Sequence, residues 1–278
     1  SITFAQVYDI ARNTGAYLIE QLGVDRTPVA VFAGRKMVTP AYFLGVVYAG
    51  RPYAPIDASL PDKRIEKILE NLCPRAIVAD RESLEHVESI VDELAKAEGF
   101  DRPQIFIAED ISRFEQVACA DSNCKISESA GDAVTDSEND TDGGVVAGCA
   151  GKIDDSSRDM LAVVRRQMSM TDPLYIIYTS GSTGNPKGVM TSHLSLMTYI
   201  NAYCDVMHIE ESDVLGNQSP LDYIAAIRDI YLPLKTGCST AIIPKEYFME
   251  PNALFDYMND KKVSSVGWSV SAFTILTS

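Results

Sequence analysis

The sequence predicts an α/β fold in which helices flank parallel, doubly wound sheets. Short apolar segments that favour β-structure, at residues 29–33, 76–79 and 104–108, alternate with longer segments whose apolar residues recur at helical spacing. Strands that are separated by helices pair in parallel with right-handed crossovers. The 278 residues, 46% of them hydrophobic, are enough for the core of one large domain or two smaller ones.

The first half of the chain begins with an amphipathic helix, expected over residues 2–22. Phe4, Val7 and Ile10 start its apolar face, Thr3 is a plausible N-cap and Gly23 a plausible stop. Further helices are expected between the strands named above, at residues 38–48, 61–71 and 82–97.

The second half repeats this alternation after a buried strand at residues 174–178. We expect a strand-like segment at 213–218, and strands at 239–243 and 263–268. Helices are expected at residues 194–206, 223–234 and 251–259, and the last residues resemble the start of another helix.

Residues 119–160 differ from the rest of the chain. They are rich in Ser, Asp, Gly and Ala, lack aromatic residues, and carry ten acidic against three basic residues, a net charge of −7. Such a stretch buries too little apolar surface to offset the entropy of ordering, so we expect a disordered or loosely held insertion. A calcium site is the alternative, although the spacing does not fit an EF-hand loop. The expected domains are a first α/β subdomain (1–118), the insertion (119–160) and a second α/β subdomain (161–278).

The overall charge limits the classes of partner. The net charge is −15 and the sequence pI about 4.6, which argues against a nucleic acid or an anionic membrane as the main partner, because both require a basic surface. No stretch approaches 18 uninterrupted apolar residues, and the first residues lack a basic-then-apolar leader, so we expect a cytoplasmic protein. The six cysteines and three histidines are scattered, which favours free thiols over a metal site.

The segment that follows strand 174–178 has the composition of a polyphosphate-binding loop. Glycines let backbone N–H groups approach phosphate oxygens, hydroxyl groups donate hydrogen bonds, and a lysine supplies a mobile positive charge. An ordinary surface turn is the alternative. A Walker A loop is disfavoured, because Lys187 is neither preceded by glycine nor followed by Ser or Thr. The candidate phosphate-binding residues are Thr179, Ser180, Gly181, Ser182, Thr183, Gly184 and Lys187.

This loop also carries a family resemblance. YTSGSTGNPKGV at residues 178–189, with His193 shortly after it, resembles the signature loop of the adenylate-forming (AMP-binding) superfamily. That superfamily includes amino-acid adenylation domains of peptide synthetases, D-alanine–carrier protein ligases, acyl-CoA synthetases and luciferases. YAGRPYAPIDASLPDKRI at residues 48–65 resembles a second adenylation-domain motif and favours the amino-acid branch. We take this second segment as a family marker without a catalytic assignment.

The resemblance implies a fold, a reaction and its cofactors. The chain would form the N-terminal subdomains of the adenylate-forming fold, with ATP and Mg²⁺ as cofactors. The loop would hold the β- and γ-phosphates of ATP while a carboxylate attacks the α-phosphate, with Lys187 as the catalytic residue. His193 would serve local packing at a helix start, and a role as a base is not supported.

On the substrate side, SPLDY at residues 219–223 lies where amino-acid-activating relatives carry Phe-Asp-x-Ser. The resemblance implies that Asp222 binds the α-ammonium group of the substrate. A carboxylate beside an apolar pocket suits this task, because charge pairing strengthens as water is excluded. The match departs from the pattern at Leu221 and Ile224, and the alternative is that Asp222 caps the following helix. Gly267 and Trp268 are weaker candidates for lining the substrate pocket.

The resemblance covers only the front part of such an enzyme. The later Tyr-Gly-Pro-Thr-Glu-like and Thr-Gly-Asp motifs and the C-terminal lid with its catalytic lysine are missing, so we expect a fragment that is poorly active alone. The expected function is ATP-dependent activation of an amino acid as an aminoacyl adenylate, with release of pyrophosphate. A phosphopantetheinyl carrier protein would then receive the acyl group. The alternatives are an acyl-CoA synthetase-type ligase and a non-catalytic nucleotide-binding module.

Overall fold

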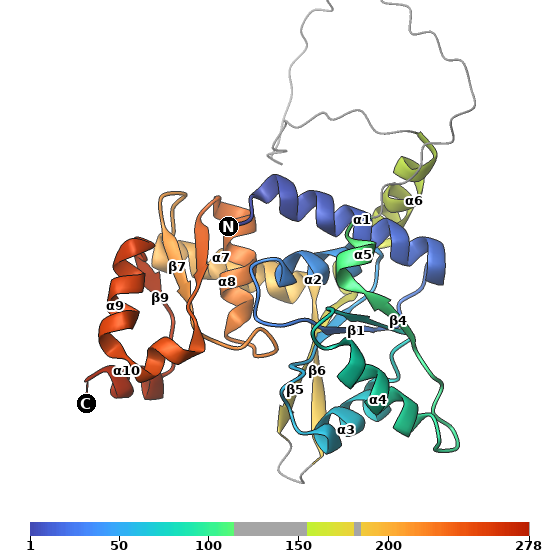
Figure 1. The fold of residues 1–278 in the computed structure, drawn as a ribbon. Coiled ribbons are helices and arrows are strands. Elements are labelled where there is room, and N and C mark those ends of the chain that lie inside the picture. The colour runs from blue at the N-terminus through green and yellow to red at the C-terminus, as the bar shows by residue number, and fades with distance from the viewer. Residues whose placement is uncertain (114–154, 181–184, 278) are drawn as a thin grey trace, which may run out of the picture.

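The computed structural model, which describes residues 1–113, 155–180 and 185–277, contains two sheets flanked by helices (Figure 1). The first sheet has six strands in the order β4-β3-β1-β2-β5-β6. Every neighbouring pair is parallel except β5 and β6. The strands are β1 (Val29–Phe32), β2 (Tyr53–Pro55), β3 (Ala76–Ala79), β4 (Gln104–Ile107), β5 (Pro173–Ser180) and β6 (Pro186–Ser192).

Helices cover both faces of the first sheet, as the sequence predicts. Successive residues of a strand point to opposite faces, and in β1 Ala30 and Phe32 pack into one core while Val29 and Val31 pack into the other. The first core includes residues of α3 (Asp62–Leu72) and α4 (Leu84–Leu94). The second core includes residues of α1 (Phe4–Leu22), α2 (Thr39–Tyr48), α5 (Ala108–Ile111) and α6 (Asp155–Gln167).

Helix α1 confirms the predicted caps. The Thr3 side chain accepts a hydrogen bond from the Gln6 backbone N–H at 3.2 Å, and the Gln6 side chain accepts one from the Thr3 backbone N–H at 2.9 Å. This reciprocal capping box satisfies two of the free donors at the helix start. Gly23 ends the helix with φ of 70°, a conformation that glycine adopts without steric cost.

Helices α1 and α2 approach closely at two glycines. A Cβ atom on Gly45 would lie 2.5 Å from the Thr14 side chain, and one on Gly15 would lie 2.6 Å from Tyr48 Cβ. We expect Gly45→Ala to lower the free energy of unfolding by about 1–3 kcal/mol, because overpacking outweighs the gain of up to ~1 kcal/mol in helix propensity. Urea denaturation measures the difference. Gly34→Ala is the matched control, because its Cβ would meet only ordinary contacts, the nearest at 3.4 Å. Equal stability of the two variants would contradict the prediction.

The second sheet has three parallel strands in the order β8-β7-β9. Its central strand β7 (Val214–Asn217) lies between β8 (Ser239–Ile242) and β9 (Ser265–Val266). Tyr231 of α8 donates a hydrogen bond to Tyr53 of β2 at 3.2 Å between the hydroxyl oxygens, so α8 belongs to the core that the two sheets share. The other elements of this half are α7 (His193–Met207), α8 (Ala226–Thr236), the 3₁₀ helix η1 (Lys245–Met249), α9 (Pro251–Asp260) and α10 (Val270–Thr277).

The structure differs from the predicted organisation around residues 155–192. Strands β5 and β6 belong to the first sheet, so the division between the sheets follows Ser192 and does not coincide with the predicted subdomain boundary at residue 161. Helix α6 begins at Asp155, inside the predicted insertion 119–160; residues 119–154 of that insertion lie outside the described residues. Among the helices of the described part of the chain, none is long and apolar enough to cross a membrane.

Candidate functional site

The carboxyl ends of strands from both sheets meet at one place. Arg35 follows β1 of the first sheet, and its guanidinium donates hydrogen bonds to the ends of β7 and β8 in the second. Its acceptors are Asn217 O at 2.6 Å, Asn217 Oδ1 at 2.8 Å, Ser219 O at 3.4 Å and Ile243 O. Because parallel strands end at a common edge, the loops after β1, β2, β7 and β8 lie together here. In open α/β sheets, ligands bind outside such carboxyl ends.

The predicted phosphate loop forms the tip of the β5–β6 hairpin. Thr179 and Ser180 are the last residues of β5, and Lys187 lies opposite Thr179 in the antiparallel register. All three are exposed, as a site for a soluble nucleotide requires. The other predicted loop residues, Gly181, Ser182, Thr183 and Gly184, lie outside the described residues.

Helix α3 contacts this hairpin close to its tip. Tyr178 Oη donates a hydrogen bond to Asn71 Oδ1 at 2.8 Å, and Lys67 Nζ donates one to Asn185 Oδ1 at 3.1 Å. Burial raises the pKa of Tyr178 to about 12, so its hydroxyl keeps its proton as a donor. Helix α3 therefore holds the hairpin next to its tip, while Thr179, Ser180 and Lys187 remain exposed.

Asp222 lies after β7, beside Asp57, which lies after β2. Both line a cavity of about 30 Å³ together with Arg35 and Lys245. Burial and the neighbouring Asp57 raise the pKa of Asp222. Burial also disfavours the charge of Asp57. Hydrogen bonds from Ser59 and the charge of Lys245 outweigh this effect and hold the pKa of Asp57 below its usual range. Lys245 Nζ lies 3.6 Å from Asp57 Oδ2. In the described part of the chain Asp222 forms no ion pair, so its charge is available to a cationic ligand group.

Gly267 and Trp268 follow β9 at the same edge of the second sheet. Gly267 lies against the guanidinium of Arg228, since a Cβ on Gly267 would be 1.1 Å from Arg228 Nη1. The Trp268 indole donates a hydrogen bond to Gly216 O in β7 at 3.0 Å. Neither residue lines the small cavity beside Asp222. The structure thus brings Asp222, Gly267 and Trp268 to one sheet edge, on opposite sides of β7.

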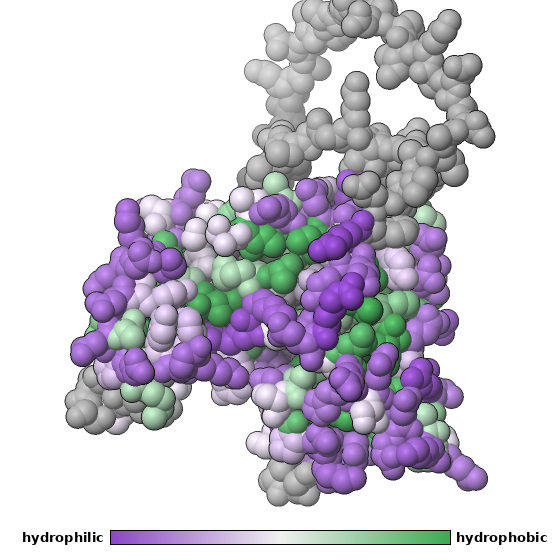
Figure 2. Space-filling view, viewed as in Figure 1, coloured by the Kyte–Doolittle hydropathy of each residue, from purple (hydrophilic) through white to green (hydrophobic). Residues whose placement is uncertain are grey.

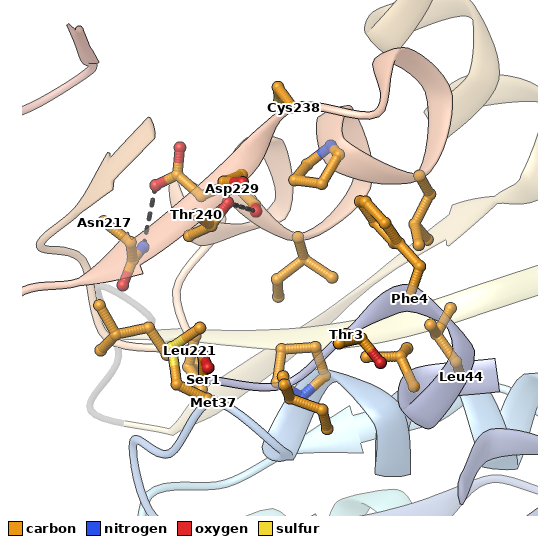
Figure 3. A pocket seen from close by; sticks show the side chains of 18 residues that line it. Ser1, Thr3, Phe4, Met37, Leu44, Asn217, Leu221, Asp229, Cys238 and Thr240 are labelled. Carbon is orange, nitrogen blue, oxygen red and sulfur yellow. Dashed lines mark hydrogen bonds between the residues drawn. The ribbon is translucent and has the colours of Figure 1, made fainter. Parts of the chain in front are cut away.

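A larger, mainly apolar pocket of about 430 Å³ lies between the start of α1 and the second sheet (Figure 3). Phe4 and Leu44 line it from the first half of the chain. At its polar end Asn217 Nδ2 donates a hydrogen bond to Asp229 Oδ2 at 2.9 Å. Hydrophobic residues are visible where α1, α2 and α8 meet (Figure 2). Leu221 lines both this pocket and the cavity beside Asp222, so the two spaces adjoin.

His193 lies at the start of α7, where Ser192 is the N-cap. The backbone N–H of His193 donates a hydrogen bond to Asp172 O at 3.2 Å. Burial lowers the pKa of the imidazole, and its Nε2 has no hydrogen-bond partner among the described residues. These contacts agree with the expected packing role.

The sequence analysis overlooked four charged residues of this edge: Arg35, Asp57, Arg228 and Lys245. A signal exists for three of them, because each follows a predicted or observed strand by one to three residues, at the end where α/β proteins bind ligands. Arg228 carries a different signal: it is a charged residue inside an otherwise apolar helical segment, next to Asp229. A buried, paired charge is the ordinary reason for such a pattern.

Mg²⁺ requires oxygen ligands, and the described residues contain no group of three or more side chains that could hold a metal ion. Mg²⁺ is commonly bound by one or two carboxylates together with phosphate oxygens of a nucleotide. The donors near the loop therefore fit an ion that arrives with ATP better than one held by protein alone.

Comparisons with known proteins agree with the geometry. The family model described as AMP-binding enzyme matches residues 1–277. The D-alanine–D-alanyl carrier protein ligase of Bacillus velezensis is 25% identical over 265 residues, which cover 95% of this chain and 42% of the relative. The ligase of the same name from Bacillus anthracis is 26% identical over 254 residues, 91% of this chain and 40% of the relative. The chain thus spans about two fifths of the length of the curated relatives it matches.

Solved structures share the fold. A four-domain nonribosomal peptide synthetase bound to AMP and glycine matches 99% of this chain and 16% of its own, with a TM-score of 0.68 and 19% identity. ATP-bound MatB from Rhodopseudomonas palustris matches 99% of this chain and 45% of its own, with a TM-score of 0.69 and 17% identity. At these identities the likeness establishes the fold alone, which is the α/β fold that the sequence predicts.

Proposed function

Since the chain belongs to the AMP-binding enzyme family, we propose that it supplies the phosphate-binding and substrate-binding edges of an ATP-dependent ligase that activates an amino acid. In this reaction a carboxylate oxygen of the amino acid forms a bond to the α-phosphorus of ATP. The bond between the α-phosphorus and the bridging oxygen breaks, so pyrophosphate leaves and an aminoacyl adenylate remains. The ligase-named relatives support transfer of the acyl group to the phosphopantetheine thiol of a carrier protein.

The residues of the hairpin tip would hold the leaving pyrophosphate. Thr179 and Ser180 donate hydrogen bonds to phosphate oxygens, and the Lys187 ammonium neutralises negative charge that builds up on the leaving group. Their exposed positions beside the loop support this role. ATP brings Mg²⁺, which would neutralise further phosphate charge when bound.

The observation that carries the amino-acid assignment is Asp222. It is a partly buried carboxylate at the meeting point of two sheets, it has no ion-pair partner in the described part of the chain, and Lys245 pairs with Asp57 instead. The backbone N–H groups of Asp222 and Asp57 donate hydrogen bonds to this carboxylate, but no cation among the described residues forms an ion pair with it. An α-ammonium group would satisfy it. Gly267 and Trp268 would contribute to the surrounding pocket from the β9 side.

Asp222→Asn tests this assignment, because it keeps the shape of the side chain and removes its charge. We expect kcat/KM for amino-acid-dependent ATP–pyrophosphate exchange to fall about 10- to 100-fold. This is the effect of losing one charge-assisted hydrogen bond, which contributes ~1.5–3 kcal/mol. Asp260→Asn, which changes an exposed carboxylate on α9, is the control and should have no effect.

The pH dependence provides a second readout. Only the ionised carboxylate attracts an ammonium group, and the pKa of Asp222 is raised. KM for the amino acid should therefore fall as the pH rises through this raised pKa, and the dependence should disappear in Asp222→Asn. An unchanged KM profile in the variant would argue against ammonium binding by Asp222.

An acyl-CoA synthetase-type ligase is the second candidate. It is favoured by the departures from the Phe-Asp-x-Ser pattern at Leu221 and Ile224, because Ile224 is half exposed and shapes no enclosed amine pocket. In that case Asp222→Asn would leave activation of simple carboxylic acids intact. Exchange with no amino acid and no carboxylic acid, in a folded protein of full length, would leave a non-catalytic nucleotide-binding module.

A further inference from the structure

The carboxyl edge of the second sheet holds two guanidinium groups and a single buried carboxylate. Arg228 and Asp229 at the start of α8 are 7% and 4% exposed. Arg228 Nε and Nη2 lie 2.7 and 2.5 Å from Asp229 Oδ1. Within the described residues, Arg35 donates hydrogen bonds to carbonyl and amide oxygens and forms no ion pair, while the charge of Asp229 also acts on its guanidinium.

The remaining acidic group that acts on Arg35 does not balance this charge. Glu246 is exposed and forms no ion pair in the described part of the chain. Arg35 is only partly buried and is compensated by four oxygen acceptors, so Arg228 is the buried guanidinium that matters on the β9 side. Removing a guanidinium from water is costly unless an anion or several acceptors compensate it.

Arg228 has an end that its ion pair does not use. Its Nη1 has one long hydrogen bond, 3.4 Å to the Tyr203 hydroxyl, and its Cζ lies 5.6 Å from the centre of the Tyr203 ring. Nη1 lies directly against Gly267, where any side chain would overlap it. Glycine at position 267 thus leaves room for the guanidinium beside the residues predicted to line the substrate pocket.

The two sides of β7 therefore differ in what they offer a ligand. On the β8 side Asp222 is a carboxylate without a cationic partner, since Lys245 pairs with Asp57. On the β9 side Arg228 is a guanidinium with donors to spare. A ligand with an ammonium group and a separate anionic group would satisfy both.

We propose that Arg228 is a specificity-determining residue that binds a second carboxylate on the substrate, so that the enzyme activates an amino acid with an acidic side chain. The proposal rests on the proposed function, in which Asp222 binds the ammonium group and the reacting carboxylate faces the phosphate loop. A guanidinium suits this role because its planar donors match a carboxylate in a bidentate arrangement. The alternative is that Arg228 serves only to neutralise Asp229.

The test is ATP–pyrophosphate exchange with the longest protein that contains this chain, using matched pairs of amino acids. Aspartate and glutamate, each in the L- and D-form, are compared with asparagine, glutamine and alanine. We expect one acidic amino acid to exceed its own amide by about 100-fold in kcat/KM, because the amide leaves the guanidinium unpaired. Arg228→Gln should remove most of this preference, because kcat/KM on the acid should fall far more than kcat/KM on its amide. Arg102→Gln, at an exposed ion pair, is the control.

Arg228→Gln leaves Asp229 without its partner and could fail to fold, so two other variants keep the test decisive. Arg228→Gln with Asp229→Asn removes both charges of the pair, and Gly267→Ala displaces the guanidinium without removing it. Both variants should lower the ratio of kcat/KM for the acid to kcat/KM for its amide. Circular dichroism checks that each variant is folded.

The outcomes distinguish failure of the Arg228 proposal from failure of the proposed ligase function. The role of Arg228 would be overturned by exchange that is fastest with alanine or another neutral amino acid. It would also be overturned if the Arg228 variants lost equal activity on acids and on amides. In both cases the ligase assignment would stand. Exchange with no amino acid at all would overturn the ligase as well.

Discussion

Replacing Lys187 by alanine should lower kcat for amino-acid-dependent ATP–pyrophosphate exchange by about 10²–10³-fold, the cost of removing one preorganised group that stabilises transition-state charge. Lys187 lies opposite Thr179 at the tip of the β5–β6 hairpin and is exposed, so its removal leaves the core intact. The effect should appear mainly in kcat, because the charge on the leaving pyrophosphate is greater in the transition state than in bound ATP.

Lys63→Ala is the matched control for this prediction. Lys63 is an exposed lysine of α3 that pairs with Glu66 at 3.0 Å. Its replacement should leave both kcat and KM unchanged. Full activity of Lys187→Ala, or an equal loss in both variants, would contradict the role assigned to Lys187.

Replacing Arg51 by methionine should lower the free energy of unfolding by about 3–5 kcal/mol, because a fully buried guanidinium and several of its hydrogen bonds are lost together. The Arg51 side chain is fully buried and pairs with Asp25. It also donates hydrogen bonds to Gly23 O at 3.0 Å and Leu22 O at 3.3 Å, at the end of α1. Methionine fills similar space but leaves these acceptors unpaired. Urea denaturation monitored by circular dichroism measures the loss.

Arg102→Met controls for the loss of an arginine in an ion pair. Arg102 pairs with Asp92 at 2.7 Å, but both side chains are more than half exposed, and such pairs contribute about 0–1 kcal/mol. The Arg51 variant should therefore unfold at a much lower urea concentration than the Arg102 variant. Similar midpoints would show that the network around Arg51 contributes little to the junction of α1 with the first sheet.

The sequence predicted most elements because their patterns are local. Strand 76–79 was predicted at its observed bounds, since β3 is an uninterrupted buried apolar run. Thr3 and Gly23 predicted the ends of α1 because caps depend on neighbouring residues. The motif after residue 178 likewise predicted the family.

Strand β6 could not be predicted from its own residues. Lys187 to Met190 are exposed, and Gly188 lies in the middle of the strand, so neither an apolar run nor an alternation marks it. Its strand conformation comes from pairing with β5, from Pro173 opposite Ser192 to Ser180 opposite Pro186. Tertiary context of this kind overrides intrinsic propensity.

The charge arrangement of the site depends on contacts between distant residues. Arg35 meets Asn217, 182 positions later in the chain, and Arg228 meets Gly267. No local pattern encodes such a contact, whereas the topology does, because it brings the carboxyl ends of both sheets together. For this reason the sequence supplied Asp222 as a candidate, whereas the contacts of Arg35 and Arg228 become visible only in the structure.

The central claim is that an amino acid and the phosphates of ATP meet at these carboxyl ends. A crystal structure of the longest protein containing this chain, bound to a non-hydrolysable aminoacyl adenylate analogue, tests it most directly. We predict the analogue's ammonium group within ~3 Å of an Asp222 carboxylate oxygen, a hydrogen-bonding distance, and its phosphate mimic beside Thr179 and Lys187. An analogue bound instead in the apolar pocket near Phe4, or bound with its ammonium group away from Asp222, would contradict the account.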